Sequence, residues 1–436
     1  VINIKNLNVD YITDKNPINA VRDVTFEIFS GEIFGLVGES GSGKSTVVQA
    51  MMRILPPPAI ISKGEVIINN EDILASSSLD VVGMRWKKIS IVMQSALNAL
   101  NPVLSIREQI HDVLKTHKNL IGLDADERAK ELLSLVEIDH DRLDSFPHQL
   151  SGGMKQRIVI AIALAIMPPI IIMDEPTTAL DVIVEREIIA KIIDLRKKLG
   201  FTILFITHDL NLLLEFADRL AIMKNGEIVE LDKVENIHAG GKHPYTKKLI
   251  GSIPSASGKR QKGLLSKPKS LNLSKNPLLE VQNLKKVFQS PGFFNKNKLI
   301  AVNDVSFKIH KGEIVGLVGE SGSGKSTVAK LVTRLIRPSE GSIYLNGENK
   351  KVTESRNVPL QYRKDVQMVF QDPFGSLNSI HTVYHHLSRP LYRHRLKDEV
   401  TMLPYIIDLL EKVGLSPGEK FAEKFPHEMS GGERQR

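Results

Sequence analysis

Alternating and continuous runs of apolar residues divide this chain of 436 residues into predicted strands and helices. The start, VINIKNLNVDY, alternates apolar and polar residues in the manner of an edge strand, whereas residues 33–38, IFGLVG, are apolar throughout. Alternation predicts a strand with one buried face, and a short continuous run predicts a strand buried on both faces. Pro168 and Pro169 interrupt the longest apolar stretch, residues 158–173, which therefore predicts a buried helix and then a buried strand rather than a membrane span of about 20 residues.

The same pattern of elements occurs twice along the chain. Residues 20–55 align without gaps to residues 301–336, and FPHQLSGGMKQR at 146–157 matches FPHEMSGGERQR at 425–436. A repeat of this length is a whole domain, since solenoid units have only about 20 to 50 residues. We therefore predict two fused α/β domains.

The expected boundaries follow from the repeat and from composition. We expect a first domain with a C-terminal extension at 1–254, a basic linker at 255–276 and a second domain at 277–436. The linker is rich in Ser, Lys and Pro and contains no Asp or Glu, which predicts a solvated, extended segment.

Composition narrows the class of protein. Hydrophobic residues make up 42% and charged residues 25% of the chain, which is typical of a folded globular protein. The chain has no cysteine, which excludes disulfides and cysteine-bound metal clusters. The net charge of +8 is compatible with nucleic acid or an anionic membrane surface, but no Lys/Arg cluster lies among aromatic residues. Scattered, solvated lysines are the favoured interpretation, and the apolar-polar alternation at the start predicts no signal peptide.

Two glycine-rich segments with the sequence GESGSGKST lie at residues 38–46 and 319–327. Both match the phosphate-loop pattern GxxxxGK(S/T), follow a predicted strand, IFGLVG or IVGLVG, and precede an amphipathic predicted helix. Backbone N–H groups at such a helix start bind phosphate, and glycines let the backbone approach it closely. Two identical copies in this context exclude a chance glycine-rich turn.

The loops predict the binding of ATP with Mg²⁺. Lys44 and Lys325 are expected to reach the β- and γ-phosphates, and Ser45 and Ser326 to hold the metal ion through their hydroxyl groups. The nucleotide-binding residues predicted in the two loops are Gly38, Glu39, Ser40, Gly41, Ser42, Gly43, Lys44, Ser45, Thr46, Gly319, Gly322, Ser323, Gly324, Lys325, Ser326 and Thr327.

Polar residues at the ends of further apolar runs are candidates for catalysis. IIIMDE, residues 170–175, predicts a buried parallel strand that carries Asp174 to Mg²⁺ and Glu175 to the attacking water. On this segment alone, a pair of solvated acids at a strand end is an equally good interpretation. FTILFIT, residues 201–207, predicts the neighbouring strand, and His208 follows it, placed to link the γ-phosphate with Glu175.

Two glutamines complete the candidate site. Gln94 ends the apolar run KISIVMQ, and Gln371 ends VQMVFQ in the second copy. The predicted catalytic residues are Glu175, His208 and Gln94, and the predicted metal ligands are Ser45, Gln94, Asp174, Ser326 and Gln371.

With these motifs the chain resembles the nucleotide-binding subunits of ABC transporters. LSGGMKQR at 150–157 and MSGGERQR at 429–436 resemble the signature motif of that family. The resemblance implies tandem P-loop NTPase domains, each with a RecA-like core, an antiparallel β subdomain and a helical subdomain. It also implies that Asp181 lies in the D-loop and that Tyr11 and Phe288 stack on adenine.

The signature has a physical reason as well, since its serine and glycines start a helix and so form a second anion-binding terminus. The resemblance implies head-to-tail pairing of two cassettes, which ATP closes and hydrolysis reopens. In that pairing, Lys44 works opposite Ser430, Gly431 and Gly432, and Lys325 works opposite Ser151, Gly152 and Gly153.

Narrower features resemble the ATPases of importers for oligopeptides, dipeptides and nickel, with fused versions that import glutathione. They are HPYTKKLIGSIP at 243–254, QDPFGSLN at 371–378 and LNALNP at 97–102, although Ser95 and Ala96 follow Gln94 where the family has Asp-Pro. The resemblance implies two membrane-spanning permease subunits, an extracytoplasmic solute-binding protein and a location at the cytoplasmic face of the membrane.

A tandem ABC ATPase that acts on ribosomes or nucleic acid is the alternative. A chromosome-maintenance ATPase would carry a long coiled coil between Lys44 and Ser151, and a repair ATPase of the zinc-bearing kind would carry cysteines. A translation factor would have a charged helical linker in place of the Pro- and Ser-rich linker. We therefore expect an importer ATPase and no direct contact with nucleic acid.

The second copy ends at Arg436, before a counterpart of Asp174. We therefore expect the second domain to be truncated after its signature motif and the site at Lys325 to be unable to hydrolyse ATP. We also expect apolar faces of this copy to be exposed and the natural protein to continue past Arg436.

Overall fold

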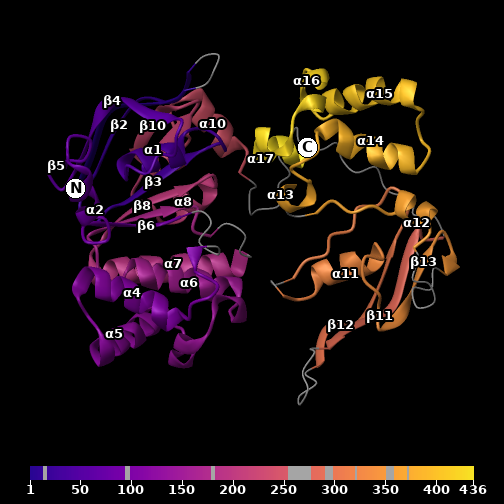
Figure 1. The fold of residues 1–436 in the computed structure, drawn as a ribbon, viewed down its shortest axis with the longest axis horizontal. Coiled ribbons are helices and arrows are strands. Elements are labelled where there is room, and N and C mark those ends of the chain that lie inside the picture. The colour runs from indigo at the N-terminus through magenta and orange to yellow at the C-terminus, as the bar shows by residue number, and fades with distance from the viewer. Residues whose placement is uncertain are drawn as a thin grey trace. The chain divides into compact units, whose positions relative to one another are not determined.

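The computed structural model describes residues 1–12, 17–93, 99–177, 182–253, 276–289, 298–319, 322–349, 358–370 and 373–436. The chain divides into two compact units, Val1–Ser266 and Lys267–Arg436 (Figure 1). The division falls within the predicted linker at 255–276.

A six-stranded sheet forms the centre of the first unit, in the order β10-β9-β3-β8-β7-β6. All neighbouring strands are parallel except β9 and β10, which form a hairpin. The carboxyl ends of β3, β7 and β8 therefore meet at one edge of the sheet. The strands are β3 (Ile33–Gly38), β6 (Ile89–Val92), β7 (Ile170–Asp174), β8 (Thr202–Thr207), β9 (Arg219–Lys224) and β10 (Glu227–Lys233).

The central strands are buried on both faces. In β7 and β8, Ile171 and Ile203 belong to one hydrophobic cluster with the helices, whereas Ile172 and Leu204 belong to a second cluster with the other sheet. Successive side chains of a strand point to opposite faces, so each of these positions needs an apolar residue. This explains the continuous apolar runs and confirms the predicted buried strands.

An antiparallel sheet covers one face of the central sheet, in the order β2-β1-β4-β5. Its strands are β1 (Ile2–Tyr11), β2 (Ile18–Ile28), β4 (Ala59–Ile68) and β5 (Glu71–Asp72). The prediction of an edge strand at the start of the chain is wrong, because Ile4 of β1 lies opposite both Phe26 of β2 and Val66 of β4. Alternation reports which face of a strand is buried, not where the strand lies in the sheet.

Helices cover the other face of the central sheet. Helices α4 (Ile106–Lys118), α5 (Gly122–Leu135) and α6 (Gly152–Ala163) lie together on one side of this unit (Figure 1), with short 3-10 turns at His140–Asp144 and Pro147–Gln149. Ser105 and Glu108 form a reciprocal capping box at the start of α4, which satisfies backbone donors that a helix start leaves open.

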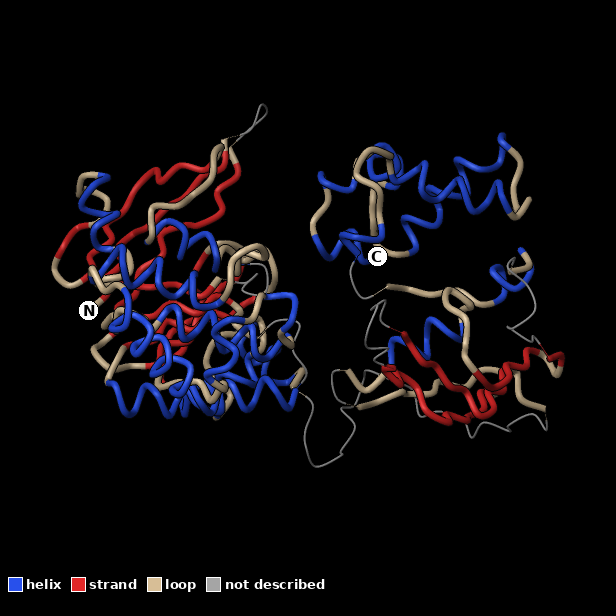
Figure 2. The backbone as a smooth tube through the Cα atoms, turned by 60° about the horizontal axis from the view of Figure 1, so that its bottom comes forward, coloured by secondary structure: helices blue, strands red, loops and turns tan. Residues whose placement is uncertain are grey.

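The remaining helices of this unit are short, apart from α7. They are α1 (Lys44–Met51), α2 (Ser78–Met84), α7 (Val182–Leu199), α8 (Leu210–Phe216), α9 (Val234–His238) and α10 (Pro244–Gly251). Figure 2 shows the strands of this unit gathered above a layer of helices. Within the described ranges, no helix is both long and apolar enough to cross a membrane.

The second unit contains an antiparallel sheet in the order β12-β11-β13-β14 and a separate helical group (Figures 1 and 2). The strands are β11 (Leu279–Gln289), β12 (Lys298–Ile309), β13 (Glu340–Leu345) and β14 (Glu348–Asn349). The helices are α11 (Lys325–Val332), α12 (Leu360–Asp365), α13 (Pro373–Ser376), α14 (Val383–Arg393), α15 (Glu399–Lys412), α16 (Gly418–Glu423) and α17 (Gly431–Gln435), with a 3-10 turn at Pro426–Glu428.

The strand predicted at IVGLVG in the second copy is not formed. Ile314 is 97% exposed and Val318 93% exposed, whereas their counterparts in β3 are buried. In the first unit β3 is held by hydrogen bonds to β8 and β9, and the described part of the second unit has no strands that correspond to these two. Exposed apolar residues in this copy match the expectation from the sequence.

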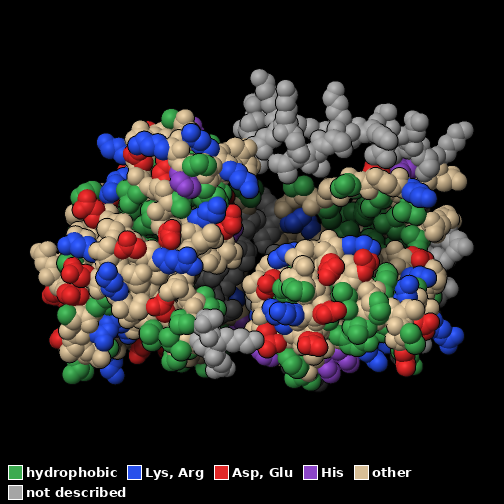
Figure 3. Space-filling model, turned by 90° about the horizontal axis from the view of Figure 1, so that it is seen from above, with side chains coloured by type: hydrophobic (Ala, Val, Ile, Leu, Met, Phe, Trp, Pro, Cys, Tyr) green, Lys and Arg blue, Asp and Glu red, His purple; other side chains and the backbone are tan. Residues whose placement is uncertain are grey.

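Charged side chains of both signs are intermixed on the face of the molecule that Figure 3 shows. The net charge of +8 is therefore not concentrated in a single basic patch on that face.

Candidate functional site

The first glycine-rich loop connects the end of β3 to the start of α1. At Gly43, φ is 100°, and a Cβ atom there would lie 2.5 Å from the carbonyl oxygen of Ala20. Both facts require glycine, because side chains disfavour positive φ and no side-chain atom fits this close to the backbone. The loop is thus pressed against β2, with its amide groups at the start of α1, where anions bind.

Lys44 is held inside this loop. Its side chain is only 5% exposed, and its Nζ donates hydrogen bonds of 2.8 Å to the carbonyl oxygens of Gly38 and Glu39. Burial lowers the pKa of Lys44, while the charges of Glu175 and Asp174 oppose that change. The ammonium group held by the loop therefore interacts with two carboxylates at the carboxyl end of β7, which β8 separates from β3 in the sheet.

Two oxygen-bearing side chains meet beside Lys44. The Ser45 hydroxyl donates to Asp174 Oδ1 over 3.3 Å, and Asp174 is 6% exposed. Burial raises the pKa of Asp174, although the hydrogen bond from Ser45 acts in the opposite direction. A hydroxyl and a carboxylate are hard oxygen ligands, and Mg²⁺ is bound through few protein groups together with phosphate oxygens. These residues therefore fit the predicted metal ion.

Glu175 follows β7, and His208 follows β8. The His208 Nδ1 lies 3.0 Å from Glu175 Oε1, and the two side chains are 61% and 13% exposed. The backbone of Glu175 has φ of 47°, a left-handed conformation that costs energy in a residue with a side chain. Its amide nitrogen donates to the Ile206 carbonyl oxygen over 2.8 Å, which holds this conformation.

A hollow of about 460 Å³ opens over the loop, within the usual size range of small-molecule sites. Tyr11, which is expected to stack on adenine, lines this hollow together with Lys44 and Glu175. Its lining residues are Tyr11, Ile18, Ala20, Ser40, Gly41, Gly43, Lys44, Ser45, Thr46, Pro58 and Glu175.

Three of these lining residues were not predicted from the sequence. Tyr11 lies opposite both Ile18 and Ala59 in the antiparallel sheet, so strand pairing brings Ile18 and Pro58 to the hollow. Ala20 begins the segment that repeats at Ala301. This repeat is the sequence feature that could have identified Ala20 as part of the site.

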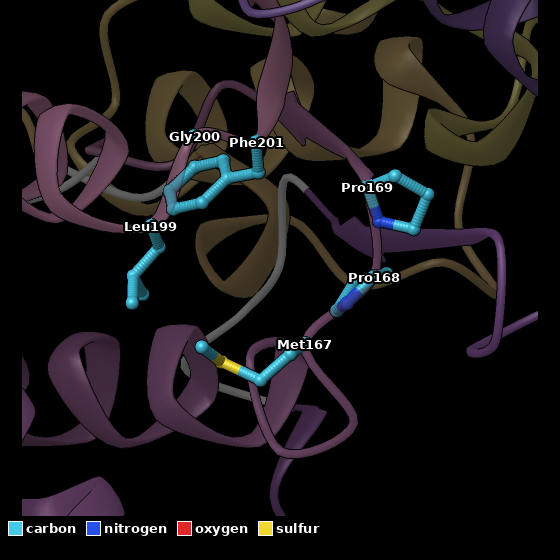
Figure 4. A pocket seen from close by; sticks show the side chains of 6 residues that line it. All are labelled: Met167, Pro168, Pro169, Leu199, Gly200 and Phe201. Atoms are coloured by element: carbon cyan, nitrogen blue, oxygen red, sulfur yellow. The ribbon is translucent and has the colours of Figure 1, made fainter.

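A second hollow, of about 240 Å³, lies at the opposite ends of β7 and β8. Figure 4 shows its lining side chains, among them Met167, Pro169, Leu199 and Phe201. No charged side chain lines it, so it offers nothing to bind phosphate. The hollow over the glycine-rich loop, which is lined by Lys44 and the loop glycines, is the candidate nucleotide site.

The signature segment of the first unit starts a helix, as predicted. Ser151 is the N-cap of α6, and its hydroxyl accepts a hydrogen bond from the Met154 amide over 3.3 Å. Ser151 and Gly152 are exposed, Gly153 is half-buried, and none of them lines the hollow over the loop. The exposed start of α6 is therefore not part of the hollow over the glycine-rich loop of its own unit.

The second copy repeats the local geometry of the loop. The Lys325 Nζ donates to the Gly319 carbonyl oxygen over 2.7 Å, and Gly324 has φ of 94°. Phe288 is 40% exposed, with the Lys286 Nζ 5.0 Å from its ring centroid. Ser430 is the N-cap of α17, whose first residues are Gly431 and Gly432.

Three predicted site residues lie outside the described parts of the chain: Gln94, Asp181 and Gln371.

The chain is similar to several known proteins. A family model described as ABC transporter matches residues 21–178 and 302–436. The glutathione import ATP-binding protein GsiA of Escherichia coli (strain K12) is 36% identical, over 100% of this chain and 74% of that protein, as is GsiA of Shigella dysenteriae serotype 1. Among solved structures, the ATP-binding cassette MJ0796 bound to ADP and Pi is 31% identical over 54% of this chain and 99% of that chain, with a TM-score of 0.49.

Proposed function

Because this chain belongs to the ABC transporter family, we propose that it is the ATP-hydrolysing subunit of an importer for peptides or related small solutes. The observation that carries the proposal is the arrangement at the glycine-rich loop, where Lys44 is buried and the hydroxyl of the adjacent Ser45 donates a hydrogen bond to Asp174, the residue before Glu175. Phosphate-binding and water-activating groups thus share one edge of the sheet.

ATP binds in the hollow over the loop. The ring of Tyr11 stacks on adenine, and the loop amides at the start of α1 hold the phosphates. Lys44 exchanges hydrogen bonds to the loop carbonyls for contacts with the β- and γ-phosphates. Ser45 and Asp174, with Gln94, hold Mg²⁺, which neutralises the charge of the phosphates when bound.

Glu175 orients the attacking water and accepts its proton. His208 contacts the γ-phosphate and fixes the Glu175 carboxylate through the pair of atoms 3.0 Å apart. The left-handed conformation of Glu175 supports this role, because such strain is common where a functional side chain must be aimed. A positioned general base contributes about 10² to 10⁴ in rate.

A second cassette completes the site across a head-to-tail interface. The start of α6 at Ser151 is exposed, and a helix start of this kind stabilises the phosphate of a nucleotide bound to the other cassette. In the second domain, which we place at 277–436, Lys325, Ser326 and Phe288 bind the other nucleotide, with Gln371 as a metal ligand. In the same way, the helix start at Ser430, Gly431 and Gly432 stabilises the phosphate of the nucleotide bound at the Lys44 site.

The relatives support the cargo class that we propose. GsiA is a glutathione import ATP-binding protein, and glutathione is a peptide. We propose that this chain powers import of peptides, glutathione, nickel complexes or similar small solutes. It acts at the cytoplasmic face of the membrane, bound to two permease subunits that receive solute from an extracytoplasmic binding protein.

A strain that lacks the gene tests this function. It should lose uptake of a labelled di- or oligopeptide, glutathione or nickel, and plasmid-borne wild-type protein should restore it, whereas the Lys44→Ala variant should not. Normal uptake of all these solutes together with a defect in translation would contradict the proposal and favour a ribosome-binding ATPase.

A further inference from the structure

The turn between β9 and β10 consists of Asn225 and Gly226. Lys224 and Glu227 pair across the hairpin on either side of it, and φ is 50° at Asn225 and 86° at Gly226. Positive φ at both positions is typical of a type I′ turn, which an Asn-Gly sequence favours. Because the flanking residues make the hairpin's own pairing, the backbone groups of Gly226 are available to other segments.

The backbone of Gly226 binds two such segments. Gly226 is buried. Its amide donates a hydrogen bond of 3.1 Å to the carbonyl oxygen of Ser42 in the glycine-rich loop, and its carbonyl oxygen accepts one of 2.8 Å from the amide of Arg22 in β2. A Cβ atom at Gly226 would lie 2.8 Å from the Ala20 carbonyl oxygen. The turn therefore contacts both the loop and β2, too closely to admit a side chain.

The end of β9 contacts the same loop at two further points. Met223 is buried, and a Cβ atom at Gly38 would lie 2.3 Å from its carbonyl oxygen. A Cβ atom at Gly43 would lie 3.3 Å from the Cε atom of Met223. The hairpin thus contacts the loop near its start, through Met223, and near its end, through Gly226, and restricts its movement on this side.

The hydrogen bond to Ser42 sets the direction of one amide group of the loop. The peptide bond between Ser42 and Gly43 is trans, so its carbonyl and N–H groups point in opposite directions. Because the turn holds the Ser42 carbonyl, the Gly43 amide points away from the turn. Gly43 is the N-cap of α1 and lines the hollow over the loop, where backbone amides bind phosphate.

We propose that Gly226 is a positioning residue of the nucleotide site: its amide holds the Ser42 carbonyl so that the Gly43 amide faces the phosphates of ATP. The hairpin of β9 and β10 then keeps the loop in the conformation that binds ATP. The inference rests on the proposed function of the loop at Lys44 as the phosphate-binding loop.

The test uses two changes of this turn in the full chain, each combined with Lys325→Ala so that one site is measured. Gly226→Ala adds a Cβ atom that meets the Ala20 carbonyl oxygen. Insertion of one glycine between Asn225 and Gly226 moves the amide away from Ser42 without adding a side chain, and three-residue hairpin loops are common. Binding of a fluorescent ATP analogue gives Kd, and thermal unfolding without nucleotide reports the fold.

The chain contains a matched control turn in its second unit. Asn346 and Gly347 connect β13 to β14, with φ of 52° and 79°. Nothing lies within 4 Å of a Cβ atom added at Gly347. Gly347→Ala, and insertion of one glycine between Asn346 and Gly347, therefore make the same local changes in a turn of the same sequence, also combined with Lys325→Ala.

We expect both changes at Gly226 to raise Kd about three- to tenfold, the effect of losing one backbone hydrogen bond that orients a phosphate-binding amide. Both changes at Gly347 should leave Kd unchanged. In the assembled transporter with Lys325 intact, the changes at Gly226 should raise KM for ATP while kcat at saturating ATP changes less than about twofold. Loss of folded protein would not produce this split.

An unchanged Kd in the protein with the glycine inserted before Gly226 would overturn the inference, and so would an equal rise in Kd from the changes at Gly347. Absence of binding by the protein with Lys325→Ala alone would instead contradict the proposed role of the Lys44 site, and the inference with it. If Gly226→Ala does not fold, the inserted glycine, which adds no Cβ atom, decides between the outcomes.

Discussion

The Nδ1 atom of His208 lies 3.0 Å from the Oε1 atom of Glu175, although the two residues follow different strands. The parallel pairing of β7 and β8 brings them together, since Asp174 lies opposite Ile206. A carboxylate oriented by an imidazole is suited to accept a proton from water.

His208→Ala should lower ATP turnover by about tenfold or more while ATP binding stays within about threefold of wild type, because the ring positions Glu175 and does not form the phosphate loop. Turnover by the transporter assembled with its permease partners measures this. His238→Ala, which removes an exposed histidine in α9, is the control and should have no effect. Wild-type turnover in His208→Ala would show that the pair has no catalytic role.

Lys44→Ala should weaken ATP binding at the first site by about 100-fold or more, because it removes the cation that faces two carboxylates and the phosphates. Titration with a fluorescent ATP analogue, in a chain that also carries Lys325→Ala, measures this loss. Lys197→Ala changes the net charge equally at an exposed position of α7 and should leave affinity unchanged. Comparable weakening in both variants would mean that only net charge matters.

The sequence predicted most of this site because its parts depend on short-range pattern. Continuous apolar runs identify β3, β7 and β8. Ligand-binding and catalytic residues of a parallel sheet lie at the carboxyl ends of its strands, so the polar residues that end these runs are the candidates. Ile18 and Pro58 were not predicted as part of the site, because they belong to segments that are far apart along the chain. The antiparallel pairing of β1 with β2 and β4, and not a local pattern, brings them beside Tyr11.

The two errors of sequence interpretation have the same origin. IVGLVG in the second copy has the composition of β3, yet composition does not supply the hydrogen-bond partners that make an isolated segment a strand. Likewise, the alternation of β1 does not say that β2 and β4 occupy both of its edges. Local pattern predicts which residues can form a strand with a buried face, whereas the neighbouring strands decide whether that strand forms and where it lies in the sheet.

Gly43→Ala should weaken ATP binding and destabilise the first unit by about 2 kcal/mol or more, since the new Cβ meets the Ala20 carbonyl oxygen in addition to the strain at positive φ. Gly200→Ala is the control, because its φ is 75° and nothing lies within 4 Å of the added atom. It should cost about 1 kcal/mol through backbone strain alone. Urea unfolding measures both, and equal costs would contradict the close approach at Gly43.

Glu230→Ala should cost about 1 to 3 kcal/mol in unfolding free energy at pH 7, because backbone amides at the start of α10 lose their acceptor. Burial acts to raise the pKa of Glu230, but the nearby Thr246 hydroxyl and the hydrogen bonds from the Lys242 and His243 amides lower it overall. A lowered pKa in the folded state contributes stability above the ordinary pKa of about 4.3, and this contribution disappears as pH falls through the folded value.

The difference in unfolding free energy between wild type and Glu230→Ala should therefore be constant from pH 7 to about pH 5 and shrink below about pH 4. Urea unfolding at pH 7 and at the lowest pH where the protein stays folded measures it. A difference that grows as pH falls would contradict the assigned role of the Glu230 carboxylate.

The most direct test of the central claim is ATP turnover by the Glu175→Gln variant, assembled with its permease partners. Glutamine keeps the shape of the side chain but cannot accept a proton from water, whereas the groups that hold ATP are unchanged. The account predicts ATP binding within about threefold of wild type and turnover reduced by about 100-fold or more. Turnover at the wild-type rate would show that Glu175 is not the general base and would contradict the account.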